Sequence, residues 1–162
     1  VYKGWEHILK EIPKAIKYKL KNPIVPESSL AGYSGTPLPK KLGMKPGIQV
    51  ALVNAPNDFQ QTLGTLPDSV CISSKLDSEL DLILWFTTER SDIEAQIYSI
   101  STHLHNKGGL WIIWPKKASG KATDLTQAVV REIGLSNGLV DYKIAAIDAT
   151  WSGLKFAKRK KT

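Results

Sequence analysis

The residues with the clearest chemical potential lie in a lysine-rich loop, WPKKASGKATDLT, at positions 114–126. The loop offers cations and hydroxyls directly before an expected helix, where free backbone N–H groups attract anions. The residues predicted to hold a small anion here are Lys116, Lys117, Ser119 and Thr123. The alternative is a solvated loop in which Thr123 or Asp124 only caps the helix.

The same loop is similar to part of a phosphate-binding P-loop, but it fails the motif at two positions. A P-loop needs Gly-x4-Gly-Lys-Ser/Thr, so that N–H groups surround the phosphates and a hydroxyl reaches Mg²⁺. Here Ala122 follows Gly120-Lys121, and Pro115 occupies the position of the earlier glycine. An anion site in this loop would therefore be of another kind.

Asn54 is a further candidate for the anion site, because it stands at the end of an apolar run over 48–56. Proteins that bind NAD or S-adenosylmethionine place a glycine-rich turn after the first strand, so that the cofactor can approach the backbone. In this chain no glycine follows that run until Gly64, and no carboxylate follows the next apolar run until Asp77. These features argue against both cofactors, and no cofactor is predicted.

Cysteine and histidine give little support for catalysis or metal binding. Cys71 is the single cysteine, and its neighbours Val70 and Ile72 predict a buried strand residue. His103 and His105 are expected near a helix end, where they would face different sides and have no third ligand. No metal site is predicted, and no residue is assigned as catalytic.

The elements that must position these residues can be predicted from hydrophobic patterning. Apolar runs bounded by turn residues indicate strands at 48–56, 70–73, 80–88 and 109–115, whereas three- and four-residue spacing indicates helices at 91–105 and 123–135. Two further runs, 140–148 and 154–160, flank a turn at 149–153 and predict an antiparallel hairpin. This order predicts an α/β fold with a mostly parallel sheet, a reduced Rossmann-like plan of the methyltransferase type.

The first part of the chain has a different character. Residues 2–22 carry apolar side chains at helical spacing and lysines on the opposite face, but Pro13 interrupts the helix. Residues 23–47 are rich in Pro, Gly and Ser, with a short helix expected over 37–42. We expect a basic helical extension and linker over 1–29, a Rossmann-like domain over 30–158 and a basic tail over 159–162.

The net charge of +7 is unevenly distributed along the 162 residues. Residues 1–47 carry nine lysines and three glutamates, residues 48–115 have an acidic excess, and residues 116–162 are basic again. Such a chain can attract phosphates or acidic partners without being a nucleic-acid site. Binding of nucleic acid or an acidic partner through the basic termini is the weaker alternative, because few aromatic residues accompany the lysines. A protein partner remains open.

The composition favours a cytoplasmic protein with a packed core. The hydrophobic fraction of 42% is typical of globular chains. The apolar runs are too short to span a bilayer, and no signal-peptide pattern is visible.

Four blocks of sequence, in order, resemble the bacterial Domain of Unknown Function 3052 family. The blocks are AGYSGTPLPKKLGMKPG (31–47), VALVNAP (50–56), GGLWIIWPKKASGKATDLT (108–126) and GLVDYKIAAIDATWSGLKF (138–156). The resemblance implies a small methyltransferase-like domain over about residues 30–158, without an established reaction or catalytic residue. It also indicates a ligand pocket where these blocks and the strand ends meet, lined by Ser34, Thr36, Thr87, Asp148, Trp151 and Ser152.

The function predicted from the sequence is that of a module that is non-catalytic or binds a small anionic ligand at the carboxyl ends of the strands. The enzymatic alternative is a divergent methyltransferase that uses an adenosyl cofactor despite the missing glycines.

Overall fold

The computed structural model describes residues 36–76 and 79–160. The chain divides into two units, residues 1–34 and 35–162. The helix expected over 2–22, the linker that follows it and the pocket candidate Ser34 lie outside the described residues.

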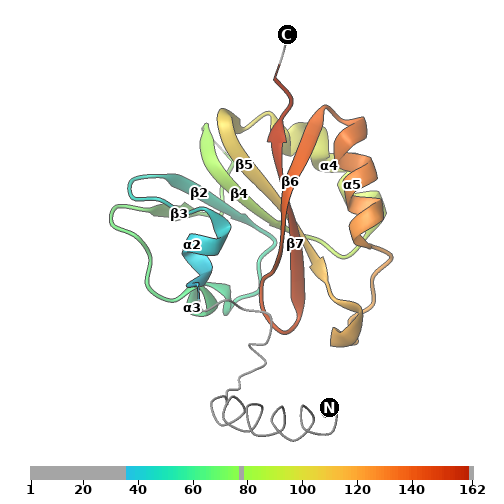
Figure 1. The fold of residues 1–162 in the computed structure, drawn as a ribbon, viewed down its shortest axis with the longest axis horizontal. Helices are drawn as coiled ribbons and strands as arrows, with labels where there is room; N and C mark the ends of the chain where they lie inside the picture. The colour runs from blue at the N-terminus through green and yellow to red at the C-terminus, as the bar shows by residue number, and fades with distance from the viewer. Residues whose placement is uncertain (1–35, 77–78, 161–162) are drawn as a thin grey trace, which may run out of the picture. The chain divides into compact units, whose positions relative to one another are not determined.

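The described residues of the second unit form a six-stranded sheet (Figure 1). Its order is β3-β2-β4-β5-β7-β6. Neighbouring strands run parallel from β3 to β5, whereas β7 runs antiparallel to both β5 and β6. The bounds are β2 Gln49–Val53, β3 Cys71–Ser73, β4 Leu80–Phe86, β5 Leu104–Pro115, β6 Leu139–Ala146 and β7 Trp151–Lys158. The expected α/β fold with a mostly parallel sheet and a closing antiparallel hairpin is confirmed.

Helices cover both faces of the sheet and give three layers. Helices α4 (Arg90–Ser101) and α5 (Gln127–Ser136) pack on one face, through a core that includes Ile97 and Val130. Helices α2 (Leu38–Leu42) and α3 (Phe59–Leu63) pack on the other face, through a second core. The central strands are buried from both sides, which explains why their sequences are almost continuously apolar.

Helix α2 is held against the sheet through the carbonyl groups at its C-terminal end. Trp111 Nε1 donates to the carbonyl oxygen of Leu42 at 2.9 Å, and Lys143 Nζ donates to that of Lys41 at 2.6 Å. Lys155 Nζ also donates to the Leu42 oxygen, at 3.3 Å. The expected helix over 37–42 is therefore present, and Gly43 ends it in the left-handed conformation with φ of 91°.

The boundary between α4 and β5 differs from the expectation. The helix ends at Ser101 rather than at residue 105, and β5 begins at Leu104 rather than at 109. The pairing with β4 is irregular here, since Leu80 pairs with Leu104 but Leu82 pairs with Gly109. Between these pairs β4 has one residue and β5 has four, and this irregular stretch hides the start of β5 in the sequence pattern.

Two further expectations about the elements were wrong. Cys71 is exposed rather than buried, because β3 is a short strand at the edge of the sheet. Helix α5 begins at Gln127 rather than at 123, with Thr126 as its N-cap; Thr126 Oγ1 accepts a hydrogen bond from the backbone N–H of Val129 at 3.2 Å. Helix α3 and the 3-10 turn η1 (Lys117–Ser119) were not expected, because each is too short to show a period.

Candidate functional site

The polar residues predicted for the site gather where the parallel strands end. Asn54 follows β2, Thr87 follows β4 and Lys116 follows β5. Because β7 runs in the opposite direction, its first residue, Trp151, lies at the same edge, and Pro115 pairs with it. In open α/β sheets this carboxyl edge is where ligands bind.

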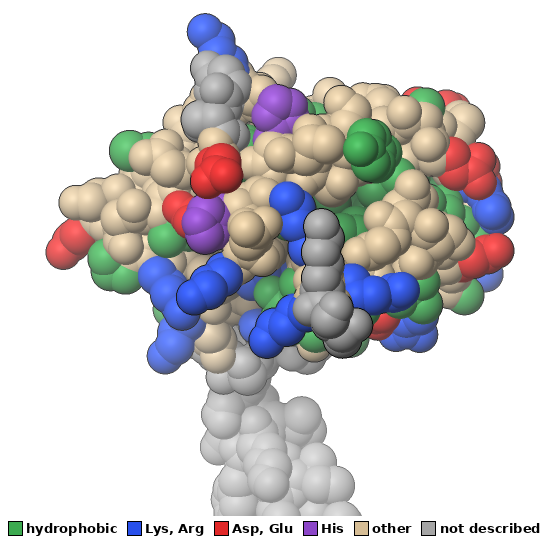
Figure 2. Space-filling view, turned by 90° about the horizontal axis from the view of Figure 1, so that it is seen from above, with side chains coloured by type: hydrophobic (Ala, Val, Ile, Leu, Met, Phe, Trp, Pro, Cys, Tyr) green, Lys and Arg blue, Asp and Glu red, His purple; other side chains and the backbone are tan. Residues whose placement is uncertain are grey.

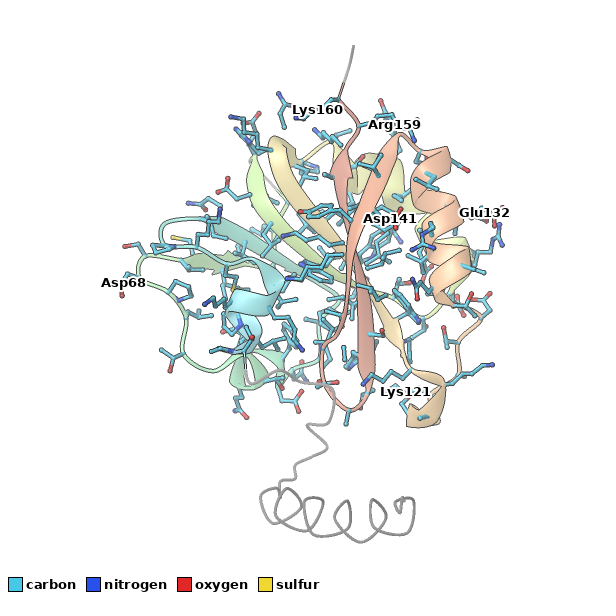
Figure 3. The ribbon with its side chains drawn as sticks, in the orientation of Figure 1. Asp68, Lys121, Glu132, Asp141, Arg159 and Lys160 are labelled. Atoms are coloured by element: carbon cyan, nitrogen blue, oxygen red, sulfur yellow. The ribbon has the colours of Figure 1, made fainter. Side chains whose placement is uncertain are left out.

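A pocket of about 450 Å³ opens at this edge. Its lining residues are Asn54, Pro56, Asp58, Lys121, Thr150 and Trp151. Figure 3 shows Lys121 beside the turn that follows β5, at the end of the sheet opposite to Arg159 and Lys160. Of the residues singled out in the sequence, only Asn54 and Trp151 line this pocket.

Asn54 makes a sharp turn directly after β2, at the place where cofactor-binding proteins of this fold class have a glycine-rich turn. Its φ of 58° lies in the left-handed region. Asparagine tolerates this conformation better than most residues that carry a side chain. The chain can therefore turn directly after β2 while it keeps a polar side chain at the strand end.

Trp151 forms a wall that is held in place by aromatic packing and by the hairpin turn. Its ring packs edge to face on Phe86, with ring centroids 5.1 Å apart. Asp148 Oδ1 accepts hydrogen bonds from the backbone N–H groups of Thr150 at 2.8 Å and Trp151 at 2.9 Å. Asp148 thus builds the turn that carries two pocket residues, and it does not itself line the pocket.

The lysine loop is fastened to that same turn. The backbone N–H of Lys116 donates to the carbonyl oxygen of Thr150 at 2.8 Å. Ser119 Oγ donates to the carbonyl oxygen of Lys116 at 2.7 Å and accepts from the N–H of Lys121 at 3.2 Å. Gly120, with φ of 79°, then reverses the chain. Ser119 therefore contributes by holding the backbone that presents Lys121.

Thr123 is likewise occupied within the protein. Its Oγ1 donates to the carbonyl oxygen of Thr88 at 2.7 Å and accepts from the N–H of Leu125 at 3.1 Å. It does not cap α5. The structure consequently does not bring Lys116, Lys117, Ser119 and Thr123 into one pocket with Asn54, although all of them belong to the same edge of the sheet.

The remaining predicted pocket residues lie apart from this pocket. Thr87 is buried, and its Oγ1 lies 3.5 Å from Asp92 Oδ2. Thr36 precedes α2, and Ser152 pairs with Trp114 and Ala146 inside the sheet. Neither residue lines the pocket.

Lys121, Asp58 and Thr150 line the pocket but were not singled out in the sequence. Lys121 had a visible signal, since it follows a glycine in the loop after a strand. The residues of this loop that the sequence analysis assigned to the anion site were Lys116, Lys117, Ser119 and Thr123. Thr150 lies within the family-like block over 138–156, next to Trp151, whereas Asp58 lies outside all four blocks; only the fold brings the two residues together.

No group of three or more His, Cys, Asp or Glu side chains within residues 36–76 and 79–160 could hold a metal ion. His105 Nδ1 instead accepts a hydrogen bond from the N–H of Lys107 at 3.1 Å. In the same described part of the chain, no helix is long and apolar enough to cross a bilayer.

The described basic residues before the C-terminus, Lys158, Arg159 and Lys160, lie at the opposite edge of the sheet. Lys158, Arg159 and Lys160 line a hollow of about 470 Å³ together with Asn106. One of these cations is partly committed to the fold, because Lys158 Nζ donates to the carbonyl oxygen of Leu104 at 2.6 Å. A partner that binds through the basic termini stays a prediction.

Solved structures similar to this fold are methyltransferases. A protein of Sulfolobus solfataricus assigned to the type 11 methyltransferases matches with a TM-score of 0.54 and 17% identity, over 76% of this chain and 90% of that one. The ribosomal protein L11 methylase of Lactobacillus delbrueckii matches with a TM-score of 0.52 and 13% identity, over 76% of this chain and 75% of that one. At these identities the likeness concerns the fold, which is the Rossmann-like fold of methyltransferases.

Residues 40–160 match the family described as Protein of unknown function (DUF3052). The chain belongs to this family, as the four sequence blocks indicated. No curated protein matches the sequence.

Proposed function

We propose that this domain binds a small anionic ligand in the pocket at the carboxyl edge of the sheet, as a sensing or carrier module without catalysis. The observation that carries the proposal is the position of Lys121 in a pocket that also contains Asn54 and Trp151. A volume of about 450 Å³ lies within the range of about 300–1,000 Å³ that is usual for small-molecule sites.

The lining residues define the chemistry of the ligand. Lys121 offers a cation for one anionic group, and the side chains of Asn54 and Thr150 can donate or accept hydrogen bonds. Trp151 offers an apolar ring to a flat part of the ligand. Asp58 also lines the pocket. Its carboxylate would repel a second negative group of the ligand and could accept a hydrogen bond from a donor group. The ligand we expect carries one anionic group, a planar part and a donor.

The second candidate function is that of a divergent methyltransferase with an adenosyl cofactor. It is favoured by the methyltransferase-like fold and by the presence of a carboxylate, Asp58, beside an aromatic wall in this pocket. Against it stands the turn Asn54-Ala55-Pro56, which has no glycine, and Pro56 has no N–H to offer a ligand.

Calorimetric titration with a small panel separates these two candidates. The panel contains inorganic phosphate, adenosine monophosphate, S-adenosylmethionine and S-adenosylhomocysteine, and a native mass spectrum of the gently purified protein reports any ligand already retained. Saturable binding of phosphate or the monophosphate, without binding of the adenosyl compounds, supports the anion module. Saturable binding of S-adenosylmethionine supports the methyltransferase candidate instead.

Lys121→Ala and Lys117→Ala form a matched pair for the same titration. Both lysines belong to the loop after β5, but only Lys121 lines the pocket. We expect Lys121→Ala to weaken binding at least tenfold and Lys117→Ala to leave it within about twofold, since a lost charge-assisted contact costs about 1.5–3 kcal/mol. The proposal is overturned if no anion in the panel binds saturably and no ligand is retained, or if the two variants behave alike.

A further inference from the structure

A second and larger hollow lies on the α2–α3 face of the sheet. We call it the α2–α3 groove; it has a volume of about 900 Å³ between helix α2 and the segment that follows α3. Its floor and walls are mainly apolar, and the residues used below are Leu38, Pro39, Met44, Leu63, Leu66 and Pro67. It shares no lining residue with the pocket at the carboxyl edge.

The groove is formed by fixed backbone rather than by mobile side chains. Four of its lining residues are prolines, whose φ angles are restricted. The N–H of Gly47 donates to the carbonyl oxygen of Asp68 at 2.9 Å, which joins the segment after α2 to the segment after α3. Met44 and Leu63 are 5% and 3% exposed, so the floor is anchored in the core. A preformed site of this kind spends little binding energy on ordering itself.

The charges around the groove are positive. Lys40 and Lys45 are its only charged lining residues, and both are exposed. Burial, and then the positive charges of Lys143 and Lys45, lower the pKa of the Lys155 amine. Figure 2, seen from above Figure 1, shows Lys and Arg side chains gathered on one side of the molecule. An anionic head group would therefore be attracted to the rim of the groove.

We propose that the α2–α3 groove binds a monoanionic amphiphile, with its apolar body on the floor formed by Met44, Leu63 and Leu66 and its carboxylate between Lys40 and Lys45. This binding site goes beyond the function proposed above and is independent of it. A hydrocarbon chain fits the apolar lining. A ligand with many polar groups along its body does not fit, because the floor offers few hydrogen-bonding partners. The exposed side chains of Lys40 and Lys45 can both reach one carboxylate at the rim. Binding there leaves no buried charge unpaired.

Met44 allows a direct test, because it is the only methionine in the chain. Protein labelled with [¹³C-methyl]methionine gives a single methyl resonance, which belongs to a residue that lines the groove. The full chain is titrated with decanoate and, separately, with decanol, both below their aggregation limits. We expect a saturable shift of the Met44 resonance with decanoate and an affinity at least fivefold lower with decanol.

Charge reversal at the rim tests the position of the carboxylate. Lys40→Glu/Lys45→Glu should weaken decanoate binding at least tenfold; both residues are exposed, and circular dichroism checks that the variant is folded. The matched control is Lys75→Glu/Lys107→Glu, two exposed lysines outside the groove, which should bind decanoate as the parent does. Lys121→Ala should also bind normally, so that failure here is distinct from failure of the carboxyl-edge pocket.

Three results would overturn the proposal. One is a Met44 resonance that does not move, which would mean that the groove takes another occupant, such as a protein segment. The others are equal affinity for decanoate and decanol, or equal weakening by the rim and control variants.

Discussion

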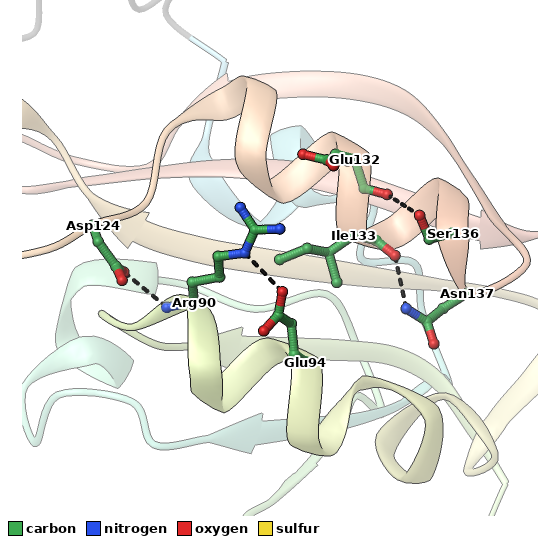
Figure 4. A network of polar contacts seen from close by, with 7 residues as sticks. All are labelled: Arg90, Glu94, Asp124, Glu132, Ile133, Ser136 and Asn137. Atoms are coloured by element: carbon green, nitrogen blue, oxygen red, sulfur yellow. Dashed lines mark hydrogen bonds and ion pairs between the residues drawn. The ribbon is translucent and has the colours of Figure 1, made fainter.

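Asp124 caps a helix that begins 34 residues earlier in the chain. Its Oδ1 accepts a hydrogen bond from the backbone N–H of Arg90, the first residue of α4, at 2.8 Å (Figure 4). Glu89, at the N-cap position of α4, makes no capping hydrogen bond with its side chain. The extended segment before α5 thus supplies the cap that α4 lacks, and a carboxylate at this place also suits the helix dipole.

Asp124→Ala should therefore destabilise the domain although Asp124 is exposed. We expect a loss of about 1 kcal/mol in the free energy of unfolding, the usual cost of removing a cap, and a smaller loss for Asp124→Asn, which keeps an acceptor oxygen. Urea denaturation followed by circular dichroism measures both. Asp58→Ala is the control, because Asp58 stands at the N-cap of α3 without a side-chain cap; an equal loss in this variant would contradict the capping role of Asp124.

Two fully buried tryptophans differ in whether their indole N–H is paired. Trp111 Nε1 donates to the carbonyl oxygen of Leu42, whereas Trp85 Nε1 has no hydrogen-bond partner among the residues that the structure describes. Replacement by phenylalanine removes similar volume in both cases, but only Trp111→Phe breaks a hydrogen bond. We expect Trp111→Phe to cost about 1–2 kcal/mol more than Trp85→Phe, by chemical denaturation. Equal costs would mean that the bond to α2 contributes nothing.

Gly134 in α5 provides space for Phe156 of β7. A Cβ atom at residue 134 would overlap the buried ring of Phe156. Helix propensity alone predicts that Gly134→Ala stabilises by about 1 kcal/mol, whereas overpacking predicts a loss of about 1–3 kcal/mol. We expect a loss, and we expect it to shrink when Phe156→Leu is also present. A double-mutant cycle in urea measures the coupling, and additive effects of the two substitutions would rule out the contact.

Lys155 should make stability depend on pH. Burial, with help from Lys143 and Lys45, lowers the pKa of its amine below the ordinary value of 10.5. In the window between the lowered pKa and 10.5 the unfolded chain binds more protons, so the free energy of unfolding rises as the pH rises. Lys41, whose pKa is lowered mainly by burial, acts in the same direction.

The pH effect can be measured with Lys155→Met, which should show a smaller rise in unfolding free energy than the parent. Measurements stay below about pH 10, because burial raises the pKa of Tyr142 above 10.0 and its ionisation would work in the opposite direction. Lys75→Met, at an exposed lysine after β3, should keep the slope of the parent. An unchanged slope in Lys155→Met would assign the effect to other groups.

The sequence was sufficient to predict the sheet, because the central strands are buried on both faces and read as apolar runs. It was not sufficient to predict which residues cap which helix. Thr123, Asp124 and Thr126 are all good capping residues in front of α5, but Thr88 and Arg90 engage the first two through the fold. Only Thr126 remains for α5, and tertiary hydrogen bonds make that choice.

The candidate site shows the same division. The end of its predicted strand places Asn54 at the carboxyl edge, whereas the sequence pattern predicts Trp151 in a turn and only the family resemblance indicates it as a pocket residue. The choice among the lysines of the loop could not be made in this way, since it depends on the turn η1, on Ser119 and on the left-handed Gly120. Together they direct Lys121, and not Lys117, to the pocket.

The place of β7 between β5 and β6 has a consequence for synthesis of the chain. Among the strands of residues 36–76 and 79–160, β6 pairs only with β7, which follows it in the sequence, so β6 leaves the ribosome before β7 does. Until residues 151–158 emerge, the nascent domain presents an open edge on β5 and an unpaired β6, both of which can bind other chains. β7 pairs with both β5 and β6, so this half of the sheet can form only after β7 has left the ribosome.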